Sequence, residues 1–222
     1  YGSTYRFLPA VREAQRLIAD GAIGEVLLLG ESLVGGSGAE GWRECGPHHY
    51  PAGGPGGGGM GLVDHGVHLV DVFRWLTGSE VEPVVGRGNI SGDAPSTEFL
   101  TMVFSSGAIG QLLYNEATHP SDLPWEGIFS WGGRWAADGS VVAGGGWDDH
   151  PMSIRVHGSH GALRIFPYAQ HLFHLTANST RQVPLEGPPM PGNFTRQLES
   201  LADSVRRDLA PEVTGEDGLR AL

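Results

Sequence analysis

Lysine is missing from this sequence, because all 14 basic residues among its 222 are arginine. Schiff-base chemistry and a lysine general base supplied by this chain are therefore excluded. Positive charge is scarce as well. The formal net charge of −11 argues against nucleic acid as a partner, since phosphate binding needs clustered basic residues.

Cysteine is almost absent. The single Cys45 cannot form a disulfide within the chain, which fits a reducing compartment, and we expect a cytoplasmic protein. No apolar run approaches the roughly 20 residues that span a bilayer, and no polybasic segment favours a membrane surface. The hydrophobic content of 40% with 18% charged residues is typical of a globular domain.

Glycine, in contrast, is abundant, with 36 residues concentrated in residues 35–61 and 132–146. We expect loops there, and long loops are often functional. The run "GGPGGGGMG" at residues 53–61 invites comparison with a phosphate-binding fingerprint, but that motif directly follows a strand. The preceding "RECGPHHYPAGG" predicts a loop instead. We therefore favour a close-packed turn or a lid over a substrate, where glycine lets the backbone approach a ligand.

The pattern of apolar residues predicts a helix that ends near Gly21, a buried strand, a second helix, a series of strands and a third helix. The expected strands and later helices cover residues 25–34, 61–77 (helix), 81–90, 97–106, 108–117, 127–137, 152–166 (a hairpin), 171–177 and 193–209 (helix). Tight turns are expected at Ser106-Gly107 and at Gly158–Gly161. This order predicts an α+β fold with a large open, mainly antiparallel sheet and helices packed on one face. The alternation of strand and helix that a doubly wound nucleotide-binding domain needs is missing.

The expected helix at residues 61–77 has two distinct sides. Its core side carries Leu62, Leu69, Phe73 and Leu76, and its opposite side carries Asp64, His68 and Asp71. His65 is a neighbour of this polar side and not a member of it.

Three interpretations of the polar side stay open. It is the exposed face of an ordinary amphipathic helix; or Asp64, four residues before His68, orients the imidazole for acid–base work; or the side chains bind a divalent metal together with His48 and His49. No second cluster with recognised ligand spacing supports the metal, so we expect none.

Four stretches, taken in order, resemble the C-terminal half of the glucose–fructose oxidoreductase/inositol dehydrogenase/MocA (Gfo/Idh/MocA) family. They are "YRFLPAVREAQRLIADGAIGEV", "GGGGMGLVDHGVHLVDVFRWLTG", "SIRVHGSHGALRIF" and "PEVTGEDGLRAL". The resemblance implies that residues 1–222 form the substrate-binding and oligomerisation domain, with an open sheet like the C-terminal domain of dihydrodipicolinate reductase. It also implies NAD or NADP as cofactor, a sugar or polyol (cyclitol) substrate, and a homo-oligomer formed through the sheet face.

The resemblance places the family's acid–base histidine on His68 and its neighbouring aspartate on Asp64. We expect Arg6 and Asp71 to contact substrate beside them. Aromatic and imidazole rings suit stacking on a sugar, so substrate contacts are also expected from the loop residues Trp42, His48, His49 and Tyr50.

The sequence lacks the motifs with which members of this family bind their cofactor. It has no N-terminal glycine fingerprint and no Glu-Lys-Pro motif, so the nucleotide-binding domain is absent from this chain; one of roughly 120 residues would have to precede Tyr1. We expect the isolated chain to lack hydride transfer. The alternatives are a stand-alone sugar-binding module without redox activity, and a cofactor-free or metal-assisted lyase, epimerase or hydrolase that uses His68 and Asp64.

Overall fold

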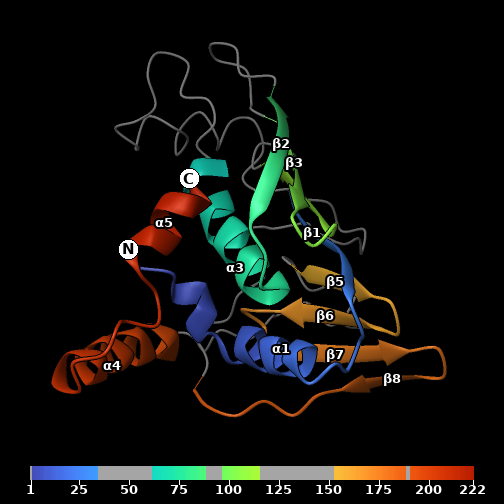
Figure 1. Cartoon of the computed structure of the whole chain (residues 1–222). Helices are drawn as coiled ribbons and strands as arrows, with labels where there is room; N and C mark the ends of the chain where they lie inside the picture. The colour runs from blue at the N-terminus through green and yellow to red at the C-terminus, as the bar shows by residue number, and fades with distance from the viewer. Residues whose placement is uncertain (1, 35–61, 89–96, 116–152, 189–190) are drawn as a thin grey trace, which may run out of the picture.

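A computed structural model of the chain describes residues 2–34, 62–88, 97–115, 153–188 and 191–222 (Figure 1). In these ranges the strands form one eight-stranded sheet in the order β2-β3-β4-β1-β5-β6-β7-β8. The strands are β1 (Val26–Val34), β2 (Val81–Gly88), β3 (Glu98–Phe104), β4 (Ile109–Asn115), β5 (Ile154–Gly158), β6 (Ala162–Phe166), β7 (His171–Thr176) and β8 (Ser179–Gln182). The helical segments are η1 (Thr4–Phe7), α1 (Pro9–Ala19), η3 (Leu62–Gly66), α3 (Val67–Thr77), α4 (Gly192–Arg206) and α5 (Gly215–Ala221).

Strand β1 lies in the middle of the sheet although it comes first in the chain. It pairs in parallel with β4 and antiparallel with β5, and the remaining pairs are antiparallel. The parallel pair arises because the chain passes through α3 and the β2–β3 hairpin before it returns beside β1. The predicted α+β class with a mainly antiparallel open sheet is confirmed.

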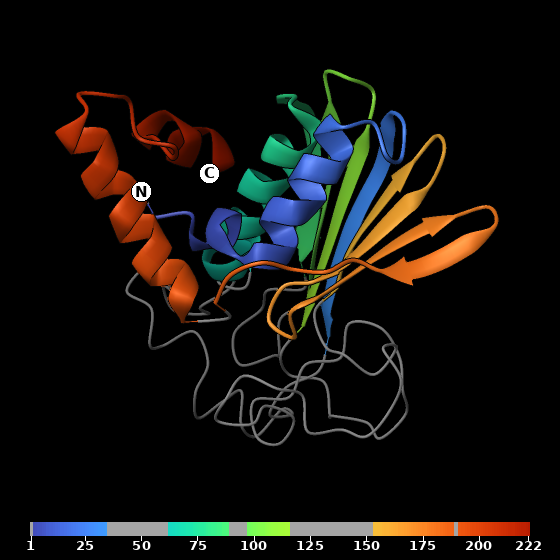
Figure 2. The ribbon, with the colours of Figure 1, turned by 90° about the horizontal axis from the view of Figure 1, so that it is seen from below.

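The two faces of the sheet differ. Helices α1 and α3 cover one face, as the view from below shows (Figure 2), and between them and the sheet lies a core that includes Leu17, Phe73, Met102 and Ile154. None of the described helices covers the opposite face, which we call the open face (Figure 2). Its central strands carry large apolar side chains that are 39–41% exposed: Leu28, Phe99, Ile109 and Leu113.

Helix α3 confirms the predicted core side, since Leu69 and Phe73 are fully buried. It follows directly on the π-helical turn η3 and ends at Gly78, whose φ of 60° is the left-handed conformation typical of a helix C-cap. The side opposite the core is not an exposed face, because the N-terminal residues of the chain pack over it and Asp71 has no exposed surface.

The predicted turns also form. Gly107 joins β3 to β4 with a φ of 88°, a conformation that favours glycine. Residues 158–161 join β5 to β6, and at Gly158 an added Cβ would meet the Ile23 carbonyl oxygen at 2.2 Å. The predicted strand at residues 127–137 lies outside the described ranges.

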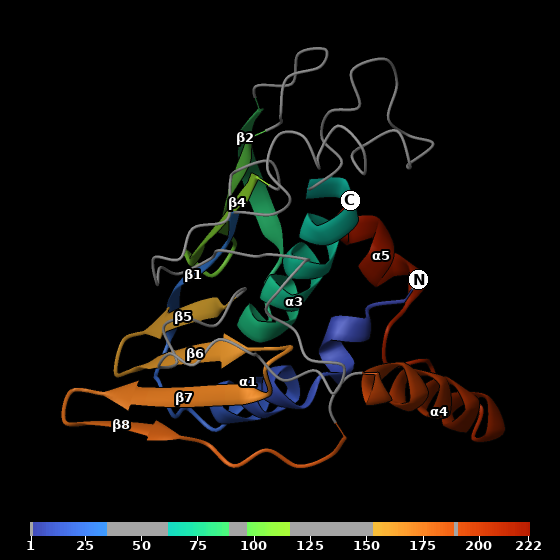
Figure 3. The same cartoon turned by 180° about the vertical axis from the view of Figure 1, so that it is seen from behind.

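The predicted C-terminal helix is confirmed as α4, which packs against η1 at a distance from the sheet (Figure 3). Its apolar side chains Phe194, Leu198, Leu201 and Val205 are 48–73% exposed. Helix α5 lies beside α3 and begins with a reciprocal capping box between Thr214 and Asp217. Among the helices described, none has the length and apolar character that crossing a membrane requires.

Candidate functional site

The polar residues of interest gather where β1 and β4 end and α3 begins. Glu31 lies on the covered face of β1, where its side chain is 3% exposed. A carboxylate buried to this extent needs partners to offset its desolvation. The Nε2 atom of His65 supplies one, at 3.1 Å from Oε1 and 3.0 Å from Oε2.

The other ring nitrogen of His65 faces Tyr5. Its Nδ1 lies 3.3 Å from the Tyr5 hydroxyl, which is also hydrogen-bonded to the hydroxyl of Tyr168. Tyr168 lies in the turn after β6 and is partly exposed. We call Tyr5, Glu31, His65 and Tyr168 the tyrosine–histidine cluster.

His68 adjoins this cluster through the ring of Tyr5. The two rings are stacked, with centroids 5.2 Å apart and planes inclined by 12°. His68 is partly buried, and its Nδ1 atom is inaccessible to solvent. Tyr5 therefore connects the predicted acid–base histidine to the pair formed by His65 and Glu31.

A second buried carboxylate anchors the turn that carries His65. Glu98, on the covered face of β3 and 2% exposed, accepts a hydrogen bond of 3.0 Å from the backbone N–H of Leu62. This bond ties the first residue of η3 to the sheet. Single π-helical turns occur frequently at functional sites, which agrees with the position of η3.

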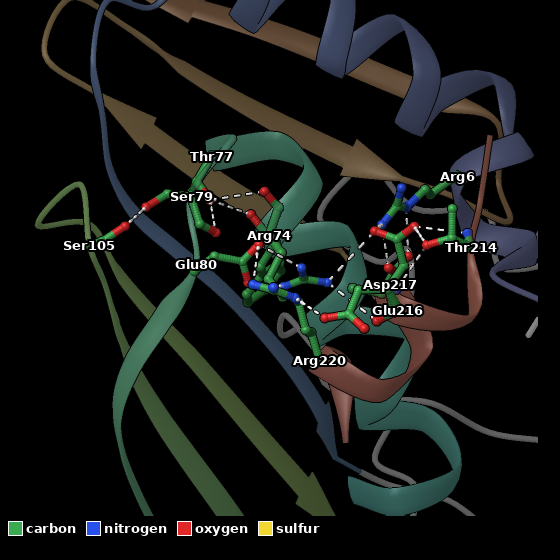
Figure 4. Close-up of polar contacts among 12 residues, drawn as sticks. Arg6, Arg74, Thr77, Ser79, Glu80, Ser105, Thr214, Glu216, Asp217 and Arg220 are labelled. Carbon is green, nitrogen blue, oxygen red and sulfur yellow. Dashed lines mark hydrogen bonds and ion pairs between the residues drawn. The ribbon is translucent and has the colours of Figure 1, made fainter. Parts of the chain in front are cut away.

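A separate set of residues lies further along α3. Arg6 binds Asp71 through two hydrogen bonds, one of them from Nε to Oδ2 at 2.7 Å. The hydroxyl of Ser3 also donates to Asp71, and Arg6 reaches the carboxylate of Asp217 at 3.2 Å. We call Ser3, Arg6, Asp71 and Asp217 the ion-pair cluster. Arg6 lies between the two carboxylates, so the cluster ties the N-terminal segment and α5 to α3 (Figure 4).

Contacts within the ion-pair cluster change the pKa values of Arg6 and Asp217. Burial on its own would lower the pKa of Arg6, but the hydrogen bonds and the charge of Asp71 raise it overall. Burial would raise the pKa of Asp217, yet the hydrogen bonds from Thr214 and the charge of Arg6 hold it below its usual value. Both groups therefore stay charged at neutral pH.

Arg74 extends this arrangement along α3. It donates two hydrogen bonds to Glu80, at 2.9 and 2.8 Å, and one of 3.3 Å to the backbone carbonyl of Asp217 (Figure 4). The Arg74 hydrogen bonds are the main reason that the pKa of Glu80 is lowered. The contacts of Arg74 link the C-terminal end of α3 to α5.

The structure places only part of the predicted site. His68 lies beside the tyrosine–histidine cluster, whereas Arg6 and Asp71 bind one another, which gives them a structural role; their contact with substrate stays a prediction. The loop residues Trp42, His48, His49 and Tyr50 and the side chain of Asp64 lie outside the described residues. Within the described part of the chain, no group of three His, Cys, Asp or Glu side chains is arranged to hold a metal ion.

Sequence reasoning missed Glu31 and Tyr168 and set His65 aside as a neighbour of the polar side. The sequence did contain a hint of Glu31, because it is the single carboxylate inside the otherwise apolar strand "VLLLGESLV". A carboxylate at such a position is either buried or marks a bend in the strand. Tyr168 gave no comparable signal. Its residue type is common in turns and strands alike, and its partner lies 163 positions away.

A groove of about 990 Å³ runs between α1 and α4 and is lined by residues that include Phe7, Arg12, Trp75 and Arg196. Its lining includes neither His65 nor His68. We therefore build the candidate site on the side-chain contacts at the start of α3.

The described residues do not by themselves fit a nicotinamide dinucleotide. Such a site uses a strand, a short glycine turn and a helix N-terminus, and in the described ranges no strand passes through such a turn into a helix. The sequence also offers no lysine to contact the cofactor. A cofactor would need residues beyond those described.

Comparisons with known proteins agree with one another. Residues 11–164 match the family model described as the GFO/IDH/MocA C-terminal domain. Among curated proteins, the rhizopine catabolism protein MocA of Rhizobium meliloti is 26% identical over 151 residues, which are 62% of this chain and 44% of that protein.

Solved structures show the same fold. An aldose-aldose oxidoreductase from Caulobacter crescentus complexed with glycerol aligns with a TM-score of 0.67 and 20% identity, over 99% of this chain and 57% of that one. A scyllo-inositol dehydrogenase from Lactobacillus casei with bound NAD(H) and scyllo-inositol aligns with a TM-score of 0.60 and 18% identity, over 99% and 58%. The chain thus spans less than two thirds of the length of these relatives.

Proposed function

The chain belongs to the GFO/IDH/MocA family through its C-terminal domain, and from this premise we propose that it is the substrate-binding half of an NAD(P)-dependent sugar or polyol dehydrogenase. The observation that carries the proposal is the position of His68. It is stacked on Tyr5 at the start of α3, where the hydroxyl and imidazole groups of the chain converge. The glycerol and scyllo-inositol bound in two structures of this fold support the substrate class.

In this proposal the residues of the chain bind a secondary alcohol and manage its proton. Loss of hydrogen from an alcohol carbon requires that the hydroxyl proton be removed, and a histidine with a pKa near neutrality suits that task. His68 is the proposed acceptor, with Asp64 orienting it or holding a neighbouring hydroxyl. NAD or NADP would be bound by a nucleotide-binding domain whose residues are not among these 222.

The experiment uses the longest open reading frame that contains these residues, assayed with NAD or NADP against inositols, aldoses and glycerol. We expect His68→Ala to lower kcat by roughly 10²- to 10⁴-fold, the range for loss of a general acid–base group. The cost in stability should stay near 1 kcal/mol, because mainly the stacking on Tyr5 is lost.

His171→Ala is the matched control, since this histidine lies on β7 and bonds Gln182, away from α3. It should keep full activity. Turnover that survives in His68→Ala would contradict the proposed role, and polyol binding without any turnover in the wild type would favour a binding module.

The open face of the sheet is the proposed contact with a second copy of the chain. Leu28 pairs with Ile109, and Phe99 with Leu113, across neighbouring strands, so this face carries two exposed apolar pairs with Gln111 between them on β4. We expect light scattering to show at least a dimer, and Leu113→Glu to reduce it to a monomer. Leu198→Glu, at an equally apolar exposed position on α4, is the control and should leave the mass unchanged.

A further inference from the structure

The tyrosine–histidine cluster has a definite hydrogen-bond direction. An ionised carboxylate only accepts hydrogen bonds, and both oxygens of Glu31 lie within 3.1 Å of His65 Nε2. The hydrogen of a neutral His65 therefore belongs on Nε2. Its Nδ1 is then an acceptor, and the Tyr5 hydroxyl, 3.3 Å away, is the donor.

The same logic fixes the next bond. Once the Tyr5 hydroxyl donates to His65, its oxygen is left to accept, so the contact between the two phenols has Tyr168 as donor. Hydrogens thus point from Tyr168 to Tyr5, from Tyr5 to His65, and from His65 to Glu31. Hydrogen bonds arranged in such a chain polarise and strengthen one another.

We propose that these four residues form a proton relay, with Tyr168 as its entry and His65, held by Glu31, as the proton store. As a second route beside direct transfer to His68, a substrate hydroxyl gives its proton to the Tyr168 oxygen, while Tyr168 passes its own proton to Tyr5 and Tyr5 passes its proton to His65 Nδ1. Each phenol ends as it began. The substrate becomes an alkoxide and His65 becomes an imidazolium, so total charge is conserved.

Burial favours this direction of transfer. Tyr168 is partly exposed, so it can meet a ligand, whereas Glu31 is 3% exposed and its negative charge stabilises an imidazolium beside it. The bond from Leu62 to Glu98 fixes the turn that carries His65. The stack of His68 on Tyr5 sets the relay beside the proposed acid–base histidine. Glu31 and Glu98 are positioning residues, since neither is placed to touch substrate.

The identity of the hydroxyl rests on the proposed function, but the relay is a property of this chain and is tested without turnover. The 222-residue protein is labelled with ¹⁵N-histidine and studied by long-range ¹H–¹⁵N correlation at a pH well above about 6.5, the usual pKa of histidine. In the wild type we expect His65 as a single Nε2–H tautomer. A wild-type Nδ1–H tautomer would overturn the relay while leaving the role of His68 untouched.

Three variants then follow the path. Tyr5→Phe should move the His65 Nδ1 signal downfield, because that nitrogen loses its donor. Tyr168→Phe, which removes the hydroxyl bonded to Tyr5, should move the same signal in the same direction by less, because the Tyr5 hydroxyl loses the donor that polarises it. Glu31→Gln should abolish the single-tautomer pattern, because an amide can donate to Nε2 as well as accept.

Gln182→Ala is the matched control: Gln182 lies 2.9 Å from Nδ1 of His171, so this change should move the His171 signal and leave His65 alone. A purely structural His65–Glu31 pair would respond to Glu31→Gln but not to Tyr168→Phe. If Tyr5→Phe moves the His65 signal and Tyr168→Phe does not, the entry at Tyr168 is wrong. Polyol turnover that depends on His68 would still stand in that case, so the two proposals fail separately.

Discussion

The two buried polar clusters are neighbours and yet suit opposite tasks. Tyr5 and Arg6 are adjacent in η1, but the first belongs to the tyrosine–histidine cluster and the second to the ion-pair cluster. In the ion-pair cluster an arginine, which stays protonated in proteins, only donates hydrogen bonds to its carboxylate partners, so it cannot take up or pass on a proton. In the tyrosine–histidine cluster, each phenol can accept one proton while it gives up another, and the imidazole can hold the additional proton.

The difference shows why burial alone does not tell which task a polar group suits. Asp71 is the most deeply buried of the described polar residues on α3. Its bonds to Ser3 and Arg6 account for its burial, and its contact with substrate stays a prediction. His65 was set aside on the helical pattern, yet it has partners whose protons are free to move. The chemical type of the partner is the better guide.

Breaking the ion-pair cluster should have the largest effect on the folded state. We expect Asp71→Ala to lower the free energy of unfolding by about 3–5 kcal/mol, because the buried Arg6 charge loses its nearest carboxylate and keeps only the longer contact with Asp217. Urea denaturation measures this as a shift of the midpoint at constant slope.

Two further variants control this prediction. The double variant Arg6→Met/Asp71→Leu removes both charges, and it should recover most of the loss. Arg16→Ala removes an arginine that pairs with Glu13 and Asp20 on the exposed side of α1, and it should leave the midpoint almost unchanged. An Asp71→Ala protein as stable as the Arg16→Ala protein would contradict the structural role of the cluster.

A smaller effect should appear on acidification. Because the folded-state pKa of Asp217 lies below its usual value of 3.8, its ionised form contributes stability above that value. The contribution is lost as the pH falls through the lower, folded-state pKa. We expect the wild type to lose stability between about pH 5 and pH 2 more steeply than Asp217→Asn, since the variant has no carboxylate to protonate.

Thermal unfolding followed across this pH range tests the prediction, and Glu216→Gln is the control on the same helix turn. Its exposed carboxylate, 60% accessible, should contribute little to the slope. Parallel slopes for the wild type and Asp217→Asn would show that Asp217 does not couple protonation to folding.

Local pattern was sufficient for much of the fold. The spacing of Leu69, Phe73 and Leu76 predicted α3, and the Ser106-Gly107 and Gly158–Gly161 turns predicted two hairpins, because a helix face or a tight turn is encoded within a few neighbouring residues. The family motif around His68 likewise lies in one continuous stretch. The order of strands was less accessible: the parallel pairing of β1 with β4 joins residues about 80 positions apart, and nothing near β1 encodes its neighbour.

The sequence by itself therefore determined most of the described helices and strands, though not β8, together with the α+β class and His68 as the residue to examine, because periodicity and contiguous motifs are local properties of the chain. Tertiary structure alone decided which polar groups meet. Glu31 and His65 are 34 positions apart, Tyr5 and His65 are 60 apart, and Tyr5 and Tyr168 are 163 apart. These contacts exist only because the strand order and the packing of α3 on the sheet bring four separate segments together, and the need to satisfy each buried polar group then selects its partner.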